Sequence, residues 1–153
     1  MHMLAPKPAN RQLPIFFNLD SVVGASPAQN LSEDVMFVQF CLRFAGDHPA
    51  GVKSPELLPI LRAVNPTGAI DTATIEAIRA TQQSIKKEFS GTVVDGRVSP
   101  AHGYFFGSHG AWTIIHFNNT VQEQCKDLWP RLDKVLGCPA ALAAAVIREV
   151  VGV

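Results

Sequence analysis

The chain has 153 residues, 47% of them hydrophobic, and its 13 basic and 13 acidic residues cancel to a formal net charge of zero. This length fits one domain, and the composition is sufficient for a buried core. Zero net charge argues against nucleic acid and anionic lipid as main partners. It also leaves little repulsion between copies, so a homo-oligomer or a larger assembly is compatible with the composition.

The N-terminal segment, residues 1–21, is predicted to be an arm. Its first 14 residues contain three prolines and few large apolar side chains. No cationic segment is followed by an apolar run, so we expect no signal peptide. No stretch reaches the ~18 apolar residues of a membrane span. We therefore expect synthesis in the cytoplasm, and export to the cell envelope would need a non-classical route.

Helices are predicted for most of the remaining chain. The first is expected from about Ser32 to Gly46, capped by Asn30 or Ser32. Its apolar residues cover nearly the whole circumference, which indicates burial on several sides or beneath a partner. They include Val35, Met36, Phe37, Val38, Phe40, Cys41, Leu42 and Phe44.

A second, shorter helix is expected from Ser54 to Val64, with Ser54 as cap and Pro55 at the first helical position. The third is expected to begin after a cap at Asp71 or Thr72 and to end near residue 89. An apolar stripe at Ile75, Ile78 and Ile85 supports it.

Three helices are expected after the turn at Asp95-Gly96. One starts at 111–113 and is interrupted at Asn118-Asn119. The next covers 120–136, where Pro130 should kink or split it. An alanine-rich helix over 139–151 completes the chain. Strand content is expected to be low, and the predicted fold class is all-α.

The residue patterns of known catalytic and metal sites are missing from the sequence. His102, His109 and His116 are spaced by seven, whereas a zinc site prefers one closely spaced ligand pair. Ser108 does not lie in a Gly-x-Ser-x-Gly turn. Each acidic candidate has a simpler explanation as a cap, turn or helix-surface residue. We therefore predict no catalytic residue, no metal and no cofactor, and a small hydrolase remains a third alternative.

The three cysteines do not form a disulfide framework, because their number is odd and their spacing wide. Cys41 lies in the apolar first helix and is expected to be a buried thiol. A single bridge between Cys125 and Cys138 stays open.

Two glutamines lie within apolar helical patterns. Gln39 and Gln82 are each explained either as a structural amide bonded to nearby backbone or as a contact to a ligand, and the structural explanation leads. Asp71 with Thr74 is explained by helix capping alone.

Three segments carry a family resemblance. The first is Asp-Val-x-x-Val-Gln-x-x-Leu at 34–42. The second is Gly-x-Ile-Asp-x-x-Thr-x-x-Ala-Ile-x-x-x-Gln at 68–82, and the third is Asp-Gly-x-Val-x-Pro at 95–100. In this order they resemble the peptidoglycan-binding-domain-like family. Thr81 stands where the pattern has an aromatic residue. Three larger departures are visible: 47–66 is an insertion, the loop over 100–111 is long, and 120–153 lies outside the module.

The resemblance implies a compact orthogonal helical bundle with a three-helix core plus added helices. The core domain would span 22–118, and 119–153 would form a C-terminal helical extension. The implied function is non-catalytic binding of peptidoglycan, without enzyme activity. The residues expected to bind the ligand lie near the third segment: Arg97, Tyr104, Phe106 and Trp112.

The alternative function is that of a structural or adaptor subunit in a secretion, injection-type or other assembly. The arm over residues 1–19 and the helices after Thr120 would then dock a protein partner.

Overall fold

The computed structural model describes residues 1–4, 16–102 and 112–152. Within these residues the chain is mostly helical, which confirms the helical class. Its helices are α1 (Ser32–Asp47), α2 (Leu58–Arg62), α3 (Thr72–Glu88), α4 (Thr113–Gln124) and α5 (Ala140–Val151). Its strands are β1 (His2–Leu4), β2 (Phe16–Asn18), β3 (Val23–Gly24) and β4 (Arg97–Val98). None of the described helices combines the length and the apolar character needed to cross a membrane.

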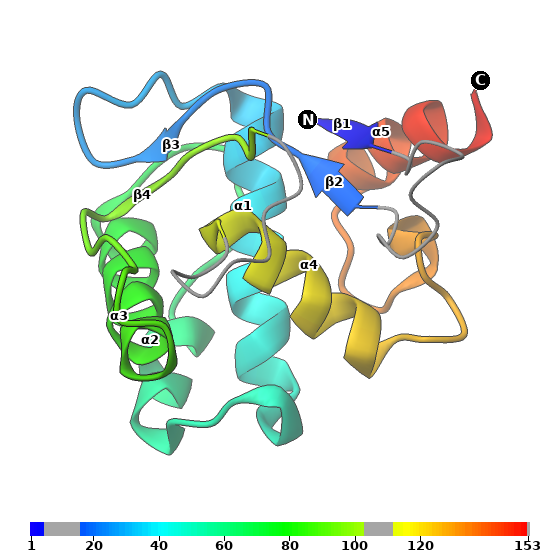
Figure 1. The fold of residues 1–153 in the computed structure, drawn as a ribbon. Helices are drawn as coiled ribbons and strands as arrows, with labels where there is room; N and C mark the ends of the chain where they lie inside the picture. Colours follow the sequence, from blue (N-terminus) through cyan, green and yellow to red (C-terminus); the bar gives the residue numbers. More distant parts are fainter. Residues whose placement is uncertain (5–15, 103–111, 153) are drawn as a thin grey trace.

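Helix α1 lies at the centre of the fold and contacts all four other helices (Figure 1). Helices α2 and α3 lie on one side of it, whereas α5 lies on the other side together with β1 and β2. The apolar circumference of α1 explains this position, because a helix that is apolar nearly all round must be covered on several sides. The predicted burial of this helix is confirmed.

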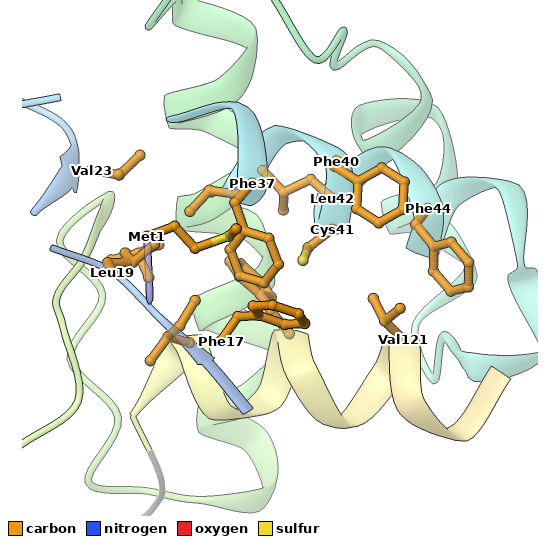
Figure 2. Close-up of a cluster of buried hydrophobic side chains, with 14 of the residues drawn as sticks. Met1, Phe17, Leu19, Val23, Phe37, Phe40, Cys41, Leu42, Phe44 and Val121 are labelled. Carbon is orange, nitrogen blue, oxygen red and sulfur yellow. The ribbon is translucent and has the colours of Figure 1, made fainter. Parts of the chain in front are cut away.

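The core is one cluster of buried side chains that draws on both ends of the chain. Phe17 of β2 lies between α1 and α4, with its ring centroid 5.6 Å from that of Phe37 (Figure 2). Trp129 meets Phe17 edge-on at the same centroid distance. Leu132 and Leu142, which follow α4 in the chain, are fully buried in the cluster. The proposed N-terminal arm and C-terminal extension therefore share one core with α1.

The described residues contain two short antiparallel pairs of strands. β1 pairs with β2, with Met3 opposite Phe17. β3 pairs with β4, with Val23 opposite Val98. The second pair joins the start of the proposed domain to the turn at 95–96. The expected low strand content is confirmed for the described part of the chain.

A buried carboxylate holds the N-terminal segment to α1. Asp34 is fully buried and accepts hydrogen bonds from the backbone N–H groups of Asp20 and Ser21. It also accepts from the Ser21 hydroxyl and forms an ion pair with the α-ammonium group of Met1 at 2.6 Å. Burial opposes the charge of that ammonium, but its hydrogen bonds to Asp20 and Asp34 outweigh burial and raise its pKa.

The predicted side-chain cap of α1 is wrong. The residue before the helix is Leu31, and no side chain caps the first turn. Asn30 adopts a left-handed conformation with φ of 54°, which asparagine tolerates better than most residues. Its amide instead closes the preceding loop by bonding both the N–H and the carbonyl of Gly24.

The predicted interruption at Asn118-Asn119 is also wrong, since α4 runs unbroken from Thr113 to Gln124. The boundary expected between residues 118 and 119 thus lies inside a helix. The helix expected over 120–136 ends at Gln124 and is followed by turns and a 3₁₀ turn at Leu132–Lys134. In this segment Leu132 is buried in the core, and Trp129 packs against it.

All three thiols are free, so the bridge between Cys125 and Cys138 is absent. The predicted burial of Cys41 is confirmed, as its side chain is only 2% exposed. Burial, with a smaller effect of Cys138, raises the pKa of Cys41 far above its usual range.

Candidate functional site

The residues of the first two recognisable segments meet through the amide of Gln39. Its Oε1 accepts a hydrogen bond from Gly68 N–H at 2.9 Å. Its Nε2 donates to the Ala69 carbonyl at 2.9 Å and to Thr74 Oγ1 at 3.0 Å. Asp71, the cap of α3, accepts from the Thr74 backbone N–H. The amide of Gln39 thus fixes the turn before α3, and the predicted cap at Asp71 is confirmed.

Gln82 makes the same kind of clamp on the next turn. Its Oε1 accepts from the backbone N–H groups of Asp95 and Gly96 at 3.1 and 3.0 Å. Its Nε2 donates to the Arg97 carbonyl at 2.7 Å. Each clamped turn contains a glycine with positive φ, which is 84° at Gly68 and 71° at Gly96. Both glutamines are fully paired structural amides, as the sequence favoured.

Two of the four residues expected to bind a ligand are described, and they lie on segments that meet at Gln82. Gln82 Nε2 bonds the Arg97 carbonyl and lies 3.5 Å from Thr113 Oγ1, next to Trp112. The Arg97 guanidinium pairs with Asp95, its Nε lying 3.5 Å from Oδ2. The ring of Trp112 packs partly against the core and meets His102 edge-on, at a centroid distance of 5.7 Å.

Tyr104 and Phe106 lie in 103–111, outside the described residues. Their contribution to a surface with Arg97 and Trp112 therefore stays a prediction.

A cavity of about 680 Å³ lies elsewhere, between α1, the insertion at 51–61, the second half of α3, and α4. Its apolar wall includes Leu42, Leu57, Ile85 and Phe117. The volume is in the range typical of small-molecule sites in proteins. The contributing parts of α3 and α4 are far from α1 in the sequence, and the packing of these two helices against α1 brings the walls together (Figure 1).

Two buried polar atoms in the wall of this cavity have no hydrogen-bond partner among the residues that the structure describes. They are His116 Nε2 and Thr81 Oγ1. The His116 ring lies against Phe89, with centroids 5.3 Å apart. Burial lowers the pKa of His116; Glu88 opposes this with a smaller effect, and Lys53 adds a smaller lowering. The imidazole is therefore neutral at pH 7, so that Nε2 can donate or accept according to its tautomer.

Charged side chains also line the cavity, and most of them are paired. Lys53 Nζ lies 2.6 Å from Glu88 Oε1, and Lys87 Nζ lies 3.6 Å from Glu56 Oε1. A hydrogen bond of 3.1 Å between the hydroxyls of Ser54 and Ser84 joins the insertion to α3. The wall carries two lysines, Lys53 and Lys87, and two glutamates, Glu88 and Glu123, so its formal charges cancel and offer no net charge to attract an ion.

The sequence pointed to the turn near Gln82 and missed this cavity. Neither Thr81 nor His116 belongs to a motif that carries chemistry. One signal was available: Thr81 stands where the resembled pattern has an aromatic residue. A small side chain there leaves space that an aromatic ring would fill.

Within the described residues, no group of three or more His, Cys, Asp or Glu side chains is arranged to hold a metal ion. His109, the middle member of the histidine series, lies outside those residues.

Comparison of the chain with protein-family models, curated proteins and solved structures found no match. The family resemblance therefore depends on the three sequence segments alone.

Proposed function

We propose that this protein is a non-catalytic binding module that attaches a partner to peptidoglycan. The observation that carries the proposal is the pair of clamps made by Gln39 and Gln82, because both glutamines and both clamped glycines belong to the resembled pattern. In this proposal α1, α3 and α4 form the three-helix core of an orthogonal bundle, and the remaining elements are additions to it.

The proposed binding surface centres on Arg97 and Trp112, with Tyr104 and Phe106 contributed by 103–111. A guanidinium forms paired hydrogen bonds with carboxylates, such as those of a stem peptide. An aromatic ring provides an apolar face with a polar edge, which suits a sugar ring. The support for grouping Arg97 with Trp112 is that their segments both reach Gln82.

Sedimentation with purified sacculi at low salt tests the proposal. The wild-type protein should co-sediment, and R97Q should reduce the bound fraction several-fold, because it removes the guanidinium while keeping the backbone of β4. K86Q is the matched control, since Lys86 is exposed on α3. W112L is the second variant, with circular dichroism to verify its fold. Failure of the wild-type protein to co-sediment, or equal binding by R97Q, W112L and K86Q, would refute the proposal.

A second candidate is an adaptor that assembles through contacts between copies of this chain. It is favoured by apolar exposure after α4, where Leu136 is 98% exposed and Val151 50%. Zero net charge leaves association between copies unopposed. Light scattering coupled to size-exclusion chromatography should then show an oligomer that L136D converts to a monomer. A monomeric wild-type protein at high concentration would refute it.

A further inference from the structure

We propose that the cavity between α1, the insertion, α3 and α4 is a binding site for an uncharged, largely apolar small molecule that carries one hydroxyl or amide group. This goes beyond peptidoglycan binding, because the cavity and the surface around Arg97 use different side chains. The inference rests on size, on two unpaired polar atoms and on the balance of charge.

The size and lining of the cavity favour a small molecule. About 680 Å³ would hold a ligand of drug-like size. Aliphatic and aromatic side chains from four segments form much of the wall, so burial of apolar ligand surface would supply most of the affinity.

The polar group of the ligand is inferred from His116 and Thr81. A buried polar atom without a partner destabilises a fold, whereas a ligand that satisfies it gains affinity. His116 Nε2 and Thr81 Oγ1 are both in this condition and both line the cavity. A hydroxyl or an amide can donate and accept, so it can satisfy either atom in either tautomer of the imidazole.

We infer that the ligand is uncharged because the charged side chains that line the cavity balance one another. Lys53 is paired with Glu88, and Lys87 is paired with Glu56. A charged ligand would have to be stripped of water without a free counter-charge from these pairs, which is costly in an apolar cavity. Glu123 also lines the cavity, so the two lysines and two glutamates of the wall cancel in formal charge and favour neither an anion nor a cation.

The test uses 4-propylphenol as the probe, because it combines an apolar body with one hydroxyl group. Binding to the full chain is followed by NMR titration, with the His116 ring nitrogens as the local reporter. We expect a saturable shift of Nε2. H116F keeps a ring beside Phe89 but removes Nε2, and T81V removes one hydroxyl at nearly constant volume. Each should weaken binding by about fivefold to tenfold, the value of one hydrogen bond.

Matched controls separate this effect from general changes of the fold. Thr92 carries a buried hydroxyl that has no partner in the described part of the chain and is not part of the cavity wall. His102 is an exposed histidine whose ring meets Trp112. T92V and H102F should bind the probe like the wild-type protein. T81F should abolish binding by filling the cavity, and its thermal unfolding verifies that it folds.

Two results would overturn the proposal: no saturable binding by the wild-type protein, or equal weakening by H116F and H102F. Retention on sacculi is measured for the same variants. If H116F and T81V are retained like the wild-type protein while losing the probe, the two sites are independent. A failure of sacculus binding alone leaves the cavity proposal standing.

Discussion

Asn118 binds both backbone groups of Phe17 through its side chain. Its Oδ1 accepts from the Phe17 N–H at 2.7 Å, and its Nδ2 donates to the Phe17 carbonyl at 2.9 Å. The same Nδ2 donates to the carbonyl of Ile114 within α4. An amide from α4 thus replaces a neighbouring strand on one edge of β2, and it fixes the N-terminal segment to the helical body.

Replacement of Asn118 by leucine should lower the free energy of unfolding by about 3 kcal/mol, because the Phe17 N–H and carbonyl would both lose their partner in a buried position. Urea unfolding monitored by circular dichroism measures the change. Asn119 is the matched control, and N119L should change stability by less than about 1 kcal/mol. Equal effects of the two substitutions would contradict the role of Asn118.

Loss of the Gln82 side chain should lower the free energy of unfolding by a similar amount. Q82L leaves the N–H groups of Asp95 and Gly96 and the carbonyl of Arg97 without this partner, so we expect a loss of about 2–4 kcal/mol. Gln83 is its exposed neighbour on α3, and Q83L should be nearly neutral. Hydrogen exchange adds a local measurement, since the Gly96 amide should lose protection in Q82L and keep it in Q83L.

Alanine substitutions at Gly24 and Gly137 distinguish the cost of backbone strain from the cost of a steric clash. Both have positive φ, 128° and 88° respectively. A Cβ on Gly24 would lie 2.1 Å from the Gly96 carbonyl oxygen, whereas a Cβ on Gly137 meets nothing within 4 Å. G137A should therefore cost only the strain of the left-handed region, about 1–2 kcal/mol. G24A should be clearly more destabilising in thermal unfolding, because β3 and β4 must also move apart. The reverse order would contradict the β3–β4 geometry.

His116 predicts a pH dependence of stability. Its pKa in the folded protein is lowered by burial, with Glu88 and Lys53 as the charged groups that act on it. The unfolded chain therefore binds a proton at His116 more readily than the folded protein does. The contribution of neutral His116 to folding stability is fully present above the pKa of the unfolded chain, about 6.5, and is lost as the pH falls through the lower pKa of the folded protein. Urea unfolding between pH 7.5 and 5 should show a larger loss for the wild-type protein than for H116F. Equal losses would show that His116 is not buried as a neutral ring.

The cysteines predict an order of reactivity with a thiol reagent at pH 8. Burial raises the pKa of all three thiols, that of Cys138 to about 11 with a further effect of Asp133. Cys41 is almost fully buried, whereas Cys125 and Cys138 are half-buried. We expect Cys125 to react first, Cys138 more slowly, and Cys41 only after denaturation. Mass spectrometry of labelled peptides measures the order, and rapid labelling of Cys41 in the folded protein would contradict it.

Local patterns predicted the helices well where one short segment carries all the information. Asp71 caps α3 by bonding Thr74, three residues away. Apolar periodicity predicted α1 and α3, and alanine-rich composition predicted α5. Gln39 and Gln82 were correctly interpreted as structural amides. The structural roles of Asn118 and Asn30 were predicted wrongly. Asn118 was expected to interrupt a helix, but its partner is the distant Phe17. Asn30 was expected to cap a helix, but it closes a loop at Gly24.

The sequence by itself determined α1, α3 and α5, the burial of α1 and the burial of the Cys41 thiol, because periodicity, capping and apolar runs act over a few residues. Only the tertiary structure decided that residues 16–19 and 132–146 complete one core with α1. It alone brought Thr81 and His116 into the wall of one cavity. A cavity is the space left between surfaces that meet, and no single segment encodes the shape of that space.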